Sequence, residues 1–377
     1  MLRSRRDLLL MATTLAILTL VGAAALAFAN GANDVSKGVA TLAGTGRSSY
    51  RTAIAWGTLW TFAGGLASLV ISVGLVKVFT SSIVAPDVLQ LSTFPLAVAS
   101  GAAAWVVLAS LSGLPVSTTH ALTGAIVGVA LTTGGSESVR WWMLVSGVAA
   151  PLALSPLISA AISYPMQAVS GSLSPARVCV ENDDVSWGAV DPGGIITAVP
   201  TRHIVVSTSG CDAVAAGSRF MPTGVLHWGA AAALSFARGV NDNAKIAAIG
   251  AFGLTTLNAD LWSAFAVTAV AMTAGSYAAG LRVTRTLGER VVAMDQDTGL
   301  PAALVSAGLV LAASFYTLPV STTHVSTGAI VGAGLRQDPG AVYWRRVGAL
   351  VSAWIVTLPI AGGLAALAAW LLRTIPS

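Results

Sequence analysis

The sequence predicts an all-α integral membrane protein, built from inverted repeats with broken helices and two re-entrant hairpins. The first observation behind this fold class is composition. Of the 377 residues, 55% are hydrophobic and 9% are charged, whereas soluble domains average about 25% charged residues. The second observation is a set of uncharged stretches, each long enough for the roughly 20 apolar residues that one membrane crossing requires. They include residues 8–33, 52–76 and 88–136.

The third observation is the duplication of two motifs along the chain. One motif reads Gly-Ala-Asn-Asp-Val in its first copy and Gly-Val-Asn-Asp-Asn in its second, at 31–35 and 239–243. The other motif, Leu-Pro-Val-Ser-Thr-Thr-His, is identical in both copies, at 114–120 and 318–324. The order of the motifs is the same in each half and their spacing nearly so, which indicates gene duplication.

Each repeat is expected to contain a long helix carrying the Asn-Asp motif, a plain span, an apolar stretch interrupted by the Pro-Val-Ser-Thr-Thr-His motif, and a closing span. Apart from the interrupted stretches, the expected helices are 8–44, 52–78 and 141–164, then 225–253, 261–281 and 347–372. The corresponding domains are 1–166 for the first transmembrane repeat, 167–222 for a central polar loop, and 223–377 for the second, inverted repeat.

The interrupted stretch of each copy is expected to form a re-entrant hairpin. The apolar residues that follow each motif, 120–133 and 324–335, are fewer than the roughly 17–25 that a crossing needs. We therefore expect half-helices with Ser-Thr-Thr at the tip, surrounded by protein or by a water-filled cavity. If the hairpin makes no crossing, each copy crosses three times, and this odd number inverts the second copy.

Positive charges set the expected orientation of this multi-pass protein in the cell membrane, whether plasma or inner. Most loop arginines, among them Arg47, Arg51, Arg282 and Arg285, fall on the side of the central loop. The positive-inside rule places that side in the cytoplasm and both termini outside. Three arginines near the N-terminus argue for the reverse. They and the apolar residues after them imitate a signal peptide, but the stretch is long and leads into a repeated motif, so we interpret it as a membrane helix.

The central loop is the longest polar stretch and contains both cysteines, Cys179 and Cys211. In the cytoplasm their thiols are expected to be free, and in the reverse orientation they could form a disulfide. A metal site that adds His203 would be short of ligands. We expect a small folded or flexible linker here.

Asp34 and Asp242 lie inside apolar helices at matching positions of the two repeats. A carboxylate at the bilayer centre costs about 2.5–3.5 kcal/mol, so the pair points to a shared functional site. We expect it to bind a cation with help from Asn33 and Asn241, because carboxylate and amide oxygens are hard ligands. Na⁺ held by the two aspartates is one interpretation and a proton carried by one of them is another. The third is a structural pair that caps a kink.

The Ser-Thr-Thr tips predict an anion site. Ser and Thr are favoured helix N-caps, and the first turn of a helix offers free N–H groups at the positive end of its dipole. Two such turns converging from opposite sides could surround a tetrahedral oxyanion; alternatively, the hydroxyls only cap the turns. The expected substrate-binding residues of the tips are Ser117, Thr118, Thr119, Ser321, Thr322 and Thr323.

Four charged or titratable residues are candidates for supporting roles. Lys37 and Lys245 follow the two aspartates by three positions, so each could pair with its carboxylate or attract the anion. His120 and His324 close the hairpin motifs and could relay protons, although we favour a structural role in holding the hairpins.

Arg238 breaks the symmetry of the repeats, because it stands where the first copy has Asn30. It is a candidate for binding the substrate anion or for acting as a counter-charge; otherwise it is ion-paired or snorkelling. The net charge is +5, but no basic cluster interleaved with aromatics predicts nucleic-acid binding. The expected partners are an oxyanion, the lipid bilayer and, as one option, a second copy in a homodimer.

These motifs resemble those of the inorganic phosphate transporter family, also called the PiT or phosphate permease family. Four motif instances in the right order carry the resemblance, which covers the chain apart from the central loop. It implies a secondary active transporter that imports inorganic phosphate by symport with Na⁺ or H⁺ through alternating access. It also implies that the Asn-Asp motifs coordinate the coupling cation and that the hairpin Ser and Thr residues hold phosphate.

Several alternatives follow from the residues and the resemblance. Relatives in this family also transport sulfate, and Arg238 departs from the uncharged or His residue that is usual at its position. The alternative to a phosphate transporter is therefore a permease for sulfate or another oxyanion. An anion channel is less favoured, since it gains little from buried carboxylates. A hydrolase using Ser117, His120 and an aspartate is disfavoured by the duplicated motif. We expect no enzyme, and no cofactor besides the coupling cation.

Overall fold

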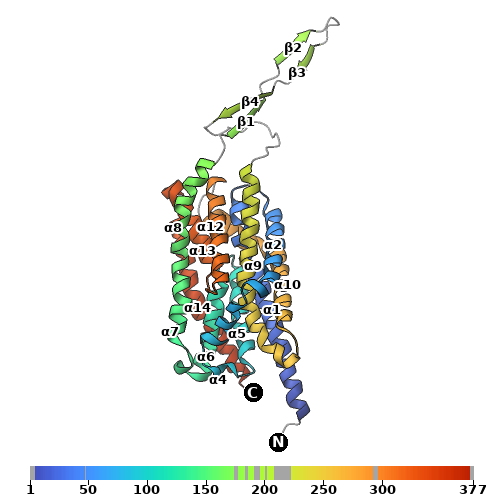
Figure 1. Ribbon diagram of the computed structural model, residues 1–377, viewed down its shortest axis with the longest axis vertical. Coiled ribbons are helices and arrows are strands. Elements are labelled where there is room, and N and C mark those ends of the chain that lie inside the picture. Colours follow the sequence, from blue (N-terminus) through green and yellow to red (C-terminus); the bar gives the residue numbers. More distant parts are fainter. Residues whose placement is uncertain are drawn as a thin grey trace.

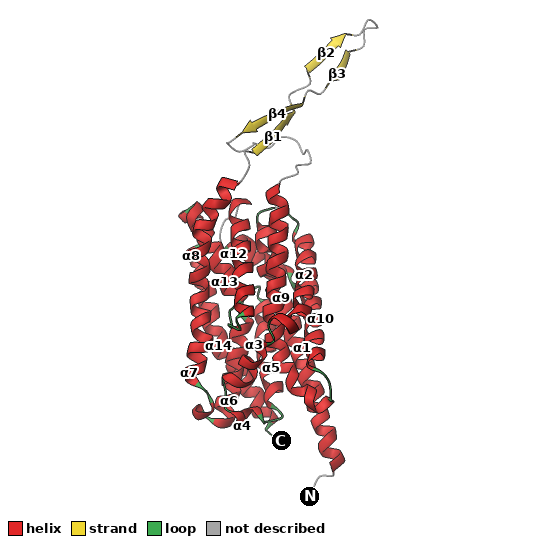
Figure 2. Ribbon diagram, viewed as in Figure 1, coloured by secondary structure: helices red, strands yellow, loops and turns green. Residues whose placement is uncertain are grey.

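The computed structural model describes residues 5–46, 48–173, 177–182, 186–190, 196–199, 202–207, 222–291 and 296–373. Its main body is a bundle of helices, and the described strands project from one end of that bundle (Figures 1 and 2). This arrangement confirms the all-α membrane part that the sequence predicts.

The first repeat begins with two long helices, α1 (Arg5–Gly44) and α2 (Tyr50–Ile71). Its other main helices are α5 (Phe94–Leu111), α6 (Thr118–Gly134) and α8 (Ala150–Leu173). Short elements join them: α3 (Gly74–Lys77), η1 (Val78–Ser82), α4 (Pro86–Leu89), η2 (Ser136–Ser138), α7 (Trp141–Leu144) and η3 (Val145–Ala149). The plain span expected at 52–78 therefore ends earlier, and a short helix and a π-helical turn follow it.

The second repeat has the same order of main helices. They are α9 (Pro222–Leu257), α10 (Leu261–Ala279), α12 (Gln296–Phe315), α13 (Thr322–Gln337) and α14 (Trp344–Leu372), and the shorter α11 (Leu281–Arg290) and η4 (Pro339–Ala341) lie between them. Helix α1 begins and α14 ends at one end of the bundle, whereas α8 ends and α9 begins at the other (Figure 1). The first hairpin, α5 and α6, lies toward the former end and α12 and α13 toward the latter (Figure 1), as inverted repeats require.

The described parts of the central segment are strands. β1 (Arg177–Asn182) pairs antiparallel with β4 (Arg202–Ser207), and β2 (Ser186–Val190) pairs antiparallel with β3 (Ile196–Val199). Cys179 lies in β1 opposite Val205, and Cys211 lies outside the described residues. The redox state of the two thiols stays a prediction.

Seven described helical stretches are long and apolar enough to cross a membrane, which confirms a multi-pass protein. They are Leu9–Gly44, Tyr50–Ile71, Phe94–Leu111, Trp141–Val169, Leu261–Ala279, Thr298–Phe315 and Trp344–Leu372. Helix α9 has 36 residues, but three charged residues in and around the second Asn-Asp motif, Arg238, Asp242 and Lys245, interrupt its apolar sequence. The helices α6 and α13 have only 17 and 16 residues, and the re-entrant path of their hairpins stays a prediction.

The break in each hairpin is a Schellman turn that ends the first helix. After α5, Leu114 N donates to Ala109 O at 2.9 Å, and Gly113 has a φ of +72°. After α12, Leu318 N donates to Ala313 O at 2.8 Å, and Thr317 takes the matching position with a φ of +60°. The left-handed residue turns the chain so that the Pro-Val-Ser-Thr-Thr-His motif leaves the helix axis.

Two glycines of the Asn-Asp motifs let helices of different repeats cross closely. Gly31 of α1 packs on the carbonyl of Met272 in α10, and Gly239 of α9 packs on the carbonyl of Thr61 in α2. A Cβ at either position would overlap the backbone it faces. Small residues are the usual means of close helix packing in membranes. These crossings hold the two Asn-Asp motifs at the centre of the bundle.

Candidate functional site

The tips of the two hairpins meet and exchange hydrogen bonds. Thr119 Oγ1 donates to the carbonyl of Val320 at 3.2 Å, and Thr323 Oγ1 donates to the carbonyl of Val116 at 2.8 Å. Swapping the repeats converts one bond into the other. The six Ser and Thr residues predicted at the tips therefore lie together, and none is more than 3% exposed.

Helices α6 and α13 each begin with a serine N-cap, as the sequence predicts. Ser117 Oγ accepts from the backbone N–H of His120 at 3.2 Å, and Ser321 Oγ accepts from that of His324 at 3.3 Å. The caps use one N–H of each first turn, while the positive ends of two helix dipoles converge on the centre of the protein. Such paired N-termini are suited to an anion.

The two predicted aspartates lie at this centre and share one donor. Asn30 Nδ2 donates to Asp34 Oδ2 at 3.1 Å, to Asp242 Oδ2 at 3.4 Å and to Thr118 Oγ1 at 2.9 Å. Thr322 Oγ1 donates to Asp34 Oδ2 at 3.4 Å. The structure thus brings together carboxylates from both repeats and hydroxyls from both hairpins.

Asn30 is a member of the site that stood out in the sequence only as the counterpart of Arg238. Its spacing of four residues from Asp34 places both side chains on one face of α1. This spacing could have predicted the contact between Asn30 and Asp34. The contacts of Asn30 with Thr118 at the tip of the first hairpin and with Asp242 of the other repeat join residues far apart in the sequence, so no local sequence pattern predicts them.

The predicted asparagines fasten the hairpins to the long helices. Asn33 Nδ2 donates to Leu114 O at 2.9 Å and to Ser110 Oγ at 3.1 Å, and its Oδ1 accepts from Val116 N at 3.1 Å. Asn241 Nδ2 donates to Asp242 Oδ1 at 2.9 Å and to Val320 O at 3.4 Å. Both side chains therefore hold a hairpin tip beside an aspartate.

Both predicted lysines pair with their aspartates. Lys37 Nζ forms an ion pair with Asp34 Oδ1, and Lys245 Nζ lies 3.6 Å from Asp242 Oδ1. Each ammonium also contacts a hairpin, since Lys37 reaches Val116 O at 3.3 Å and Lys245 reaches Val320 O at 2.7 Å. All four charged side chains are buried.

Arg238 is fully buried but lies to one side of the hairpin tips. Its Nη2 donates to Thr61 Oγ1 on α2 at 2.8 Å and to Ser276 Oγ on α10 at 3.2 Å. Its Nε and Nη1 have no hydrogen-bond partner in the described parts of the chain. The guanidinium thus adds a buried positive charge at the junction of three helices.

The two predicted histidines pack against each other in a way that suits a structural role. Their ring centroids lie 4.7 Å apart, and the ring of His324 lies 3.9 Å from that of Trp354 on α14. His324 Nδ1 donates to Leu152 O at 2.9 Å. Both line a largely apolar cavity of about 960 Å³ between α6, α8 and α14.

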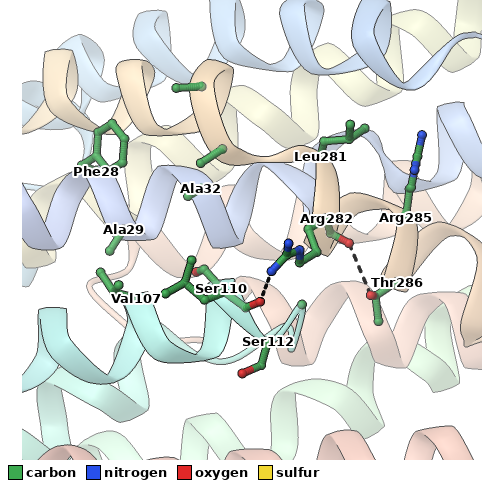
Figure 3. Close-up of a pocket in the computed structure, with 14 residues that line it drawn as sticks. Phe28, Ala29, Ala32, Val107, Ser110, Ser112, Leu281, Arg282, Arg285 and Thr286 are labelled. Atoms are coloured by element: carbon green, nitrogen blue, oxygen red, sulfur yellow. Dashed lines mark hydrogen bonds between the residues drawn. The ribbon is translucent and has the colours of Figure 1, made fainter.

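A second cavity, of about 800 Å³, lies beside the first hairpin and carries two arginines (Figure 3). Its lining includes Phe28, Ser110, Arg282 and Arg285. Figure 3 shows the Arg282 guanidinium reaching toward the end of α5, where it donates to Leu111 O. Ser110 connects this cavity to the site, because it accepts from Asn33. In the sequence, these exposed arginines served only to predict orientation.

Comparison with known proteins gives a consistent set of matches. A sequence profile described as the phosphate transporter family matches residues 30–365. A relative from Mycobacterium leprae (strain TN) is 27% identical over 369 residues, covering 96% of this chain and 79% of the relative. Another from Bacillus subtilis (strain 168) is 27% identical over 377 residues, covering 98% and 99%. Both bear the name "Probable low-affinity inorganic phosphate transporter".

A solved structure described as "The sodium-dependent phosphate transporter" has a similar fold. The TM-score is 0.77 at 20% sequence identity, and the match covers 96% of this chain and 100% of the other. The arrangement of helices is therefore shared over nearly the whole length.

Proposed function

Because this chain belongs to the phosphate transporter family, we propose that it imports inorganic phosphate by cation symport through alternating access. The observation that carries the proposal is the meeting of two half-helix N-termini at a buried site with aspartates and lysines from both repeats. Inverted repeats with broken helices around a midplane site are a recurring plan of secondary transporters. The names of the relatives support phosphate as the substrate.

The charges of the site favour an anion as the substrate. Among the side chains that the structure describes, the buried acids and bases other than histidine are Asp34, Asp242, Lys37, Lys245 and Arg238. Two carboxylates face three cations, so the site carries one net positive charge when all are ionised. The half-helix N-termini add partial positive charge. An oxyanion would neutralise this excess.

The aspartates favour phosphate over sulfate. Near neutral pH inorganic phosphate retains at least one proton, which it can donate to a carboxylate, whereas sulfate has none to donate. Asp34 Oδ2 lies within 3.4 Å of the hydroxyl of Thr322 at a hairpin tip, so an anion bound at the tips would sit near a carboxylate acceptor. A sulfate there could donate no hydrogen bond to that carboxylate.

The closure of the site favours a carrier over a channel. The six tip residues and both aspartates are each at most 3% exposed, so this conformation has the site closed off from solvent. The 800 Å³ cavity lies on one side of the first hairpin. A carrier would open the site to one side at a time as the hairpins of the two repeats rearrange.

Uptake of radiolabelled phosphate and sulfate into proteoliposomes tests this function. We expect saturable phosphate uptake that is driven by a cation gradient and is inhibited weakly by sulfate. Thr118→Ala and Thr322→Ala should each abolish it, while Ser352→Ala, an exposed hydroxyl on α14, should not. Linear uptake that does not saturate, or preference for sulfate, would contradict the proposal.

A further inference from the structure

Na⁺ is one of the two coupling cations that the proposed function allows, and the aspartates were predicted to hold it. We infer that the ammonium groups of Lys37 and Lys245 occupy the positions of such cations, so that phosphate transport by this chain needs no Na⁺. The inference rests on the proposed function for its transport part. The evidence for the inference is the set of oxygen atoms that surrounds each lysine ammonium.

The Lys37 ammonium lies in a cage of four oxygens. It contacts Asp34 Oδ1, and it lies 2.9 Å from Asn33 Oδ1, 3.4 Å from Asn33 O and 3.3 Å from Val116 O. A carboxylate, a side-chain amide and backbone carbonyls are the ligands that a hard metal cation takes from a protein. In this chain the same kinds of oxygen ligand surround the ammonium group of Lys37.

In the second repeat Lys245 likewise contacts an aspartate and a hairpin carbonyl, with a threonine hydroxyl in place of the asparagine oxygens. Its Nζ lies 2.7 Å from Val320 O, 2.8 Å from Thr119 Oγ1 and 3.6 Å from Asp242 Oδ1. Val320 and Val116 occupy the same position of the duplicated hairpin motif. Each ammonium therefore joins an aspartate of a long helix to a hairpin tip.

The other carboxylate oxygens already accept hydrogen bonds. Asp34 Oδ2 accepts from Asn30 Nδ2 and Thr322 Oγ1, and Asp242 Oδ2 accepts from the same Asn30 group. Asp242 Oδ1 also accepts from Asn241 Nδ2 at 2.9 Å. All four carboxylate oxygens thus have a donor already, and Na⁺ would have to share them with these donors.

The charge of the site also opposes a metal cation. When all are ionised, two carboxylates against Lys37, Lys245 and Arg238 leave one net positive charge before any ion enters. An added Na⁺ would raise this to two in a place sealed from water, where uncompensated charge is costly. The residues of the two cages therefore do not fit Na⁺ as long as the lysines are present.

The first test measures Na⁺ binding directly, without reference to transport. Purified full-length protein is titrated with ²²Na⁺ in a scintillation proximity assay, with choline as the counter-ion. The wild-type protein should show no saturable binding. Lys37→Asn, which removes the ammonium and leaves the oxygens, should gain saturable binding. Saturable binding by the wild type, or its continued absence in both Lys37→Asn and Lys245→Asn variants that remain folded, would overturn the inference.

The second test measures phosphate uptake with Na⁺ replaced by choline at fixed pH and membrane potential. Wild-type uptake should change less than twofold, whereas residual uptake by Lys37→Asn should become Na⁺-stimulated. The matched control is Lys77→Asn, the remaining lysine of the chain, which is exposed and lies in α3. A tenfold loss of wild-type uptake in choline would overturn the inference. Absence of phosphate uptake in every medium would instead refute the proposed function, and the ²²Na⁺ result would still decide the lysine cages.

Discussion

Thr119 of the first repeat donates a hydrogen bond to the backbone carbonyl of Val320 in the second repeat, and the second repeat returns an equivalent bond from Thr323 to Val116. The N-termini of α6 and α13 are therefore fastened to each other as well as to the long helices. If one hairpin moves during transport, these two bonds must move with it or break.

Removing one of the exchanged hydroxyls should impair both the fold and transport. We expect Thr119→Val and Thr323→Val each to reduce stability by about 1 kcal/mol, the usual net value of one hydrogen bond, and to reduce phosphate uptake at least tenfold. Both variants should lose uptake because the two bonds between the repeats are equivalent, although Thr119→Val also removes the hydroxyl that accepts from Lys245 Nζ. Thermal unfolding and proteoliposome uptake measure the two effects.

The matched control for these variants is Thr133→Val on α6, the helix of Thr119; within the described part of the chain the Thr133 hydroxyl bonds only to Val129 O and Ala130 O of its own helix. It should transport at the wild-type rate. If Thr119→Val were inactive while Thr323→Val kept full activity, the two hairpin tips would not be functionally equivalent.

The turns that end α5 and α12 predict opposite effects of two substitutions. Thr317 has a left-handed conformation that costs a non-glycine residue about 1–2 kcal/mol, whereas its counterpart is Gly113. Thr317→Gly should therefore raise the apparent Tm, and Gly113→Thr should lower it. Fluorescence-detected thermal unfolding in detergent measures both, and a lower Tm for Thr317→Gly would show that its side chain contributes more than the strain costs.

Much of the site could be predicted from the sequence because it lies in motifs that occur twice. The apolar surroundings of Asp34 and Asp242 marked them as costly residues, and the proline before each Ser-Thr-Thr marked the start of a new helix. The pairing of Lys37 with Asp34 followed from their spacing on one helix. These inferences depend only on neighbours in the chain.

The rest depends on how helices of different repeats cross, which no local pattern specifies. Asn30 bridges two aspartates only because α1 and α9 lie side by side at the centre. Arg238 reaches Thr61 and Ser276 only because α9 packs between α2 and α10. The role of Lys37 as the occupant of an oxygen cage likewise needs the carbonyl of Val116 from the hairpin.

The Lys37–Asp34 pair should show strong coupling in a double-mutant cycle. Asp34→Asn leaves a buried ammonium without its carboxylate, and breaking a buried pair in this way costs about 3–5 kcal/mol. The double variant Asp34→Asn/Lys37→Met removes both charges and should recover most of the stability, but no phosphate uptake. Thermal unfolding and uptake of the wild type, both single variants and the double variant measure this.

Additive losses of stability in that cycle would mean that the pair contributes little. Wild-type uptake by Asp34→Asn would remove the carboxylate from the transport mechanism. Asp242→Asn should also abolish uptake while the protein still reaches the membrane, which quantitative immunoblotting of membrane fractions can check.

The arginines of the 800 Å³ cavity should act by attracting the anion. We expect Arg282→Gln/Arg285→Gln to raise the KM for phosphate several-fold at low salt, with little change in kcat, and the difference should shrink at high ionic strength as the charges are screened. The control is Arg140→Gln, an exposed arginine outside this cavity that donates to Ser81 O. A fall in kcat at constant KM would assign these arginines to the conformational step instead.

Arg238 supplies the third positive charge of the site, and replacing it by the residue of the first repeat tests what that charge does. Arg238→Asn leaves two cations against two carboxylates, so we expect the KM for phosphate to rise about tenfold, equivalent to about 1.4 kcal/mol. Arg238→Lys keeps the charge and should retain most of the affinity, although it loses the Nη2 group that donates to both Thr61 and Ser276. If both variants lose thermal stability equally and keep the wild-type KM, Arg238 serves only to hold α9 between α2 and α10.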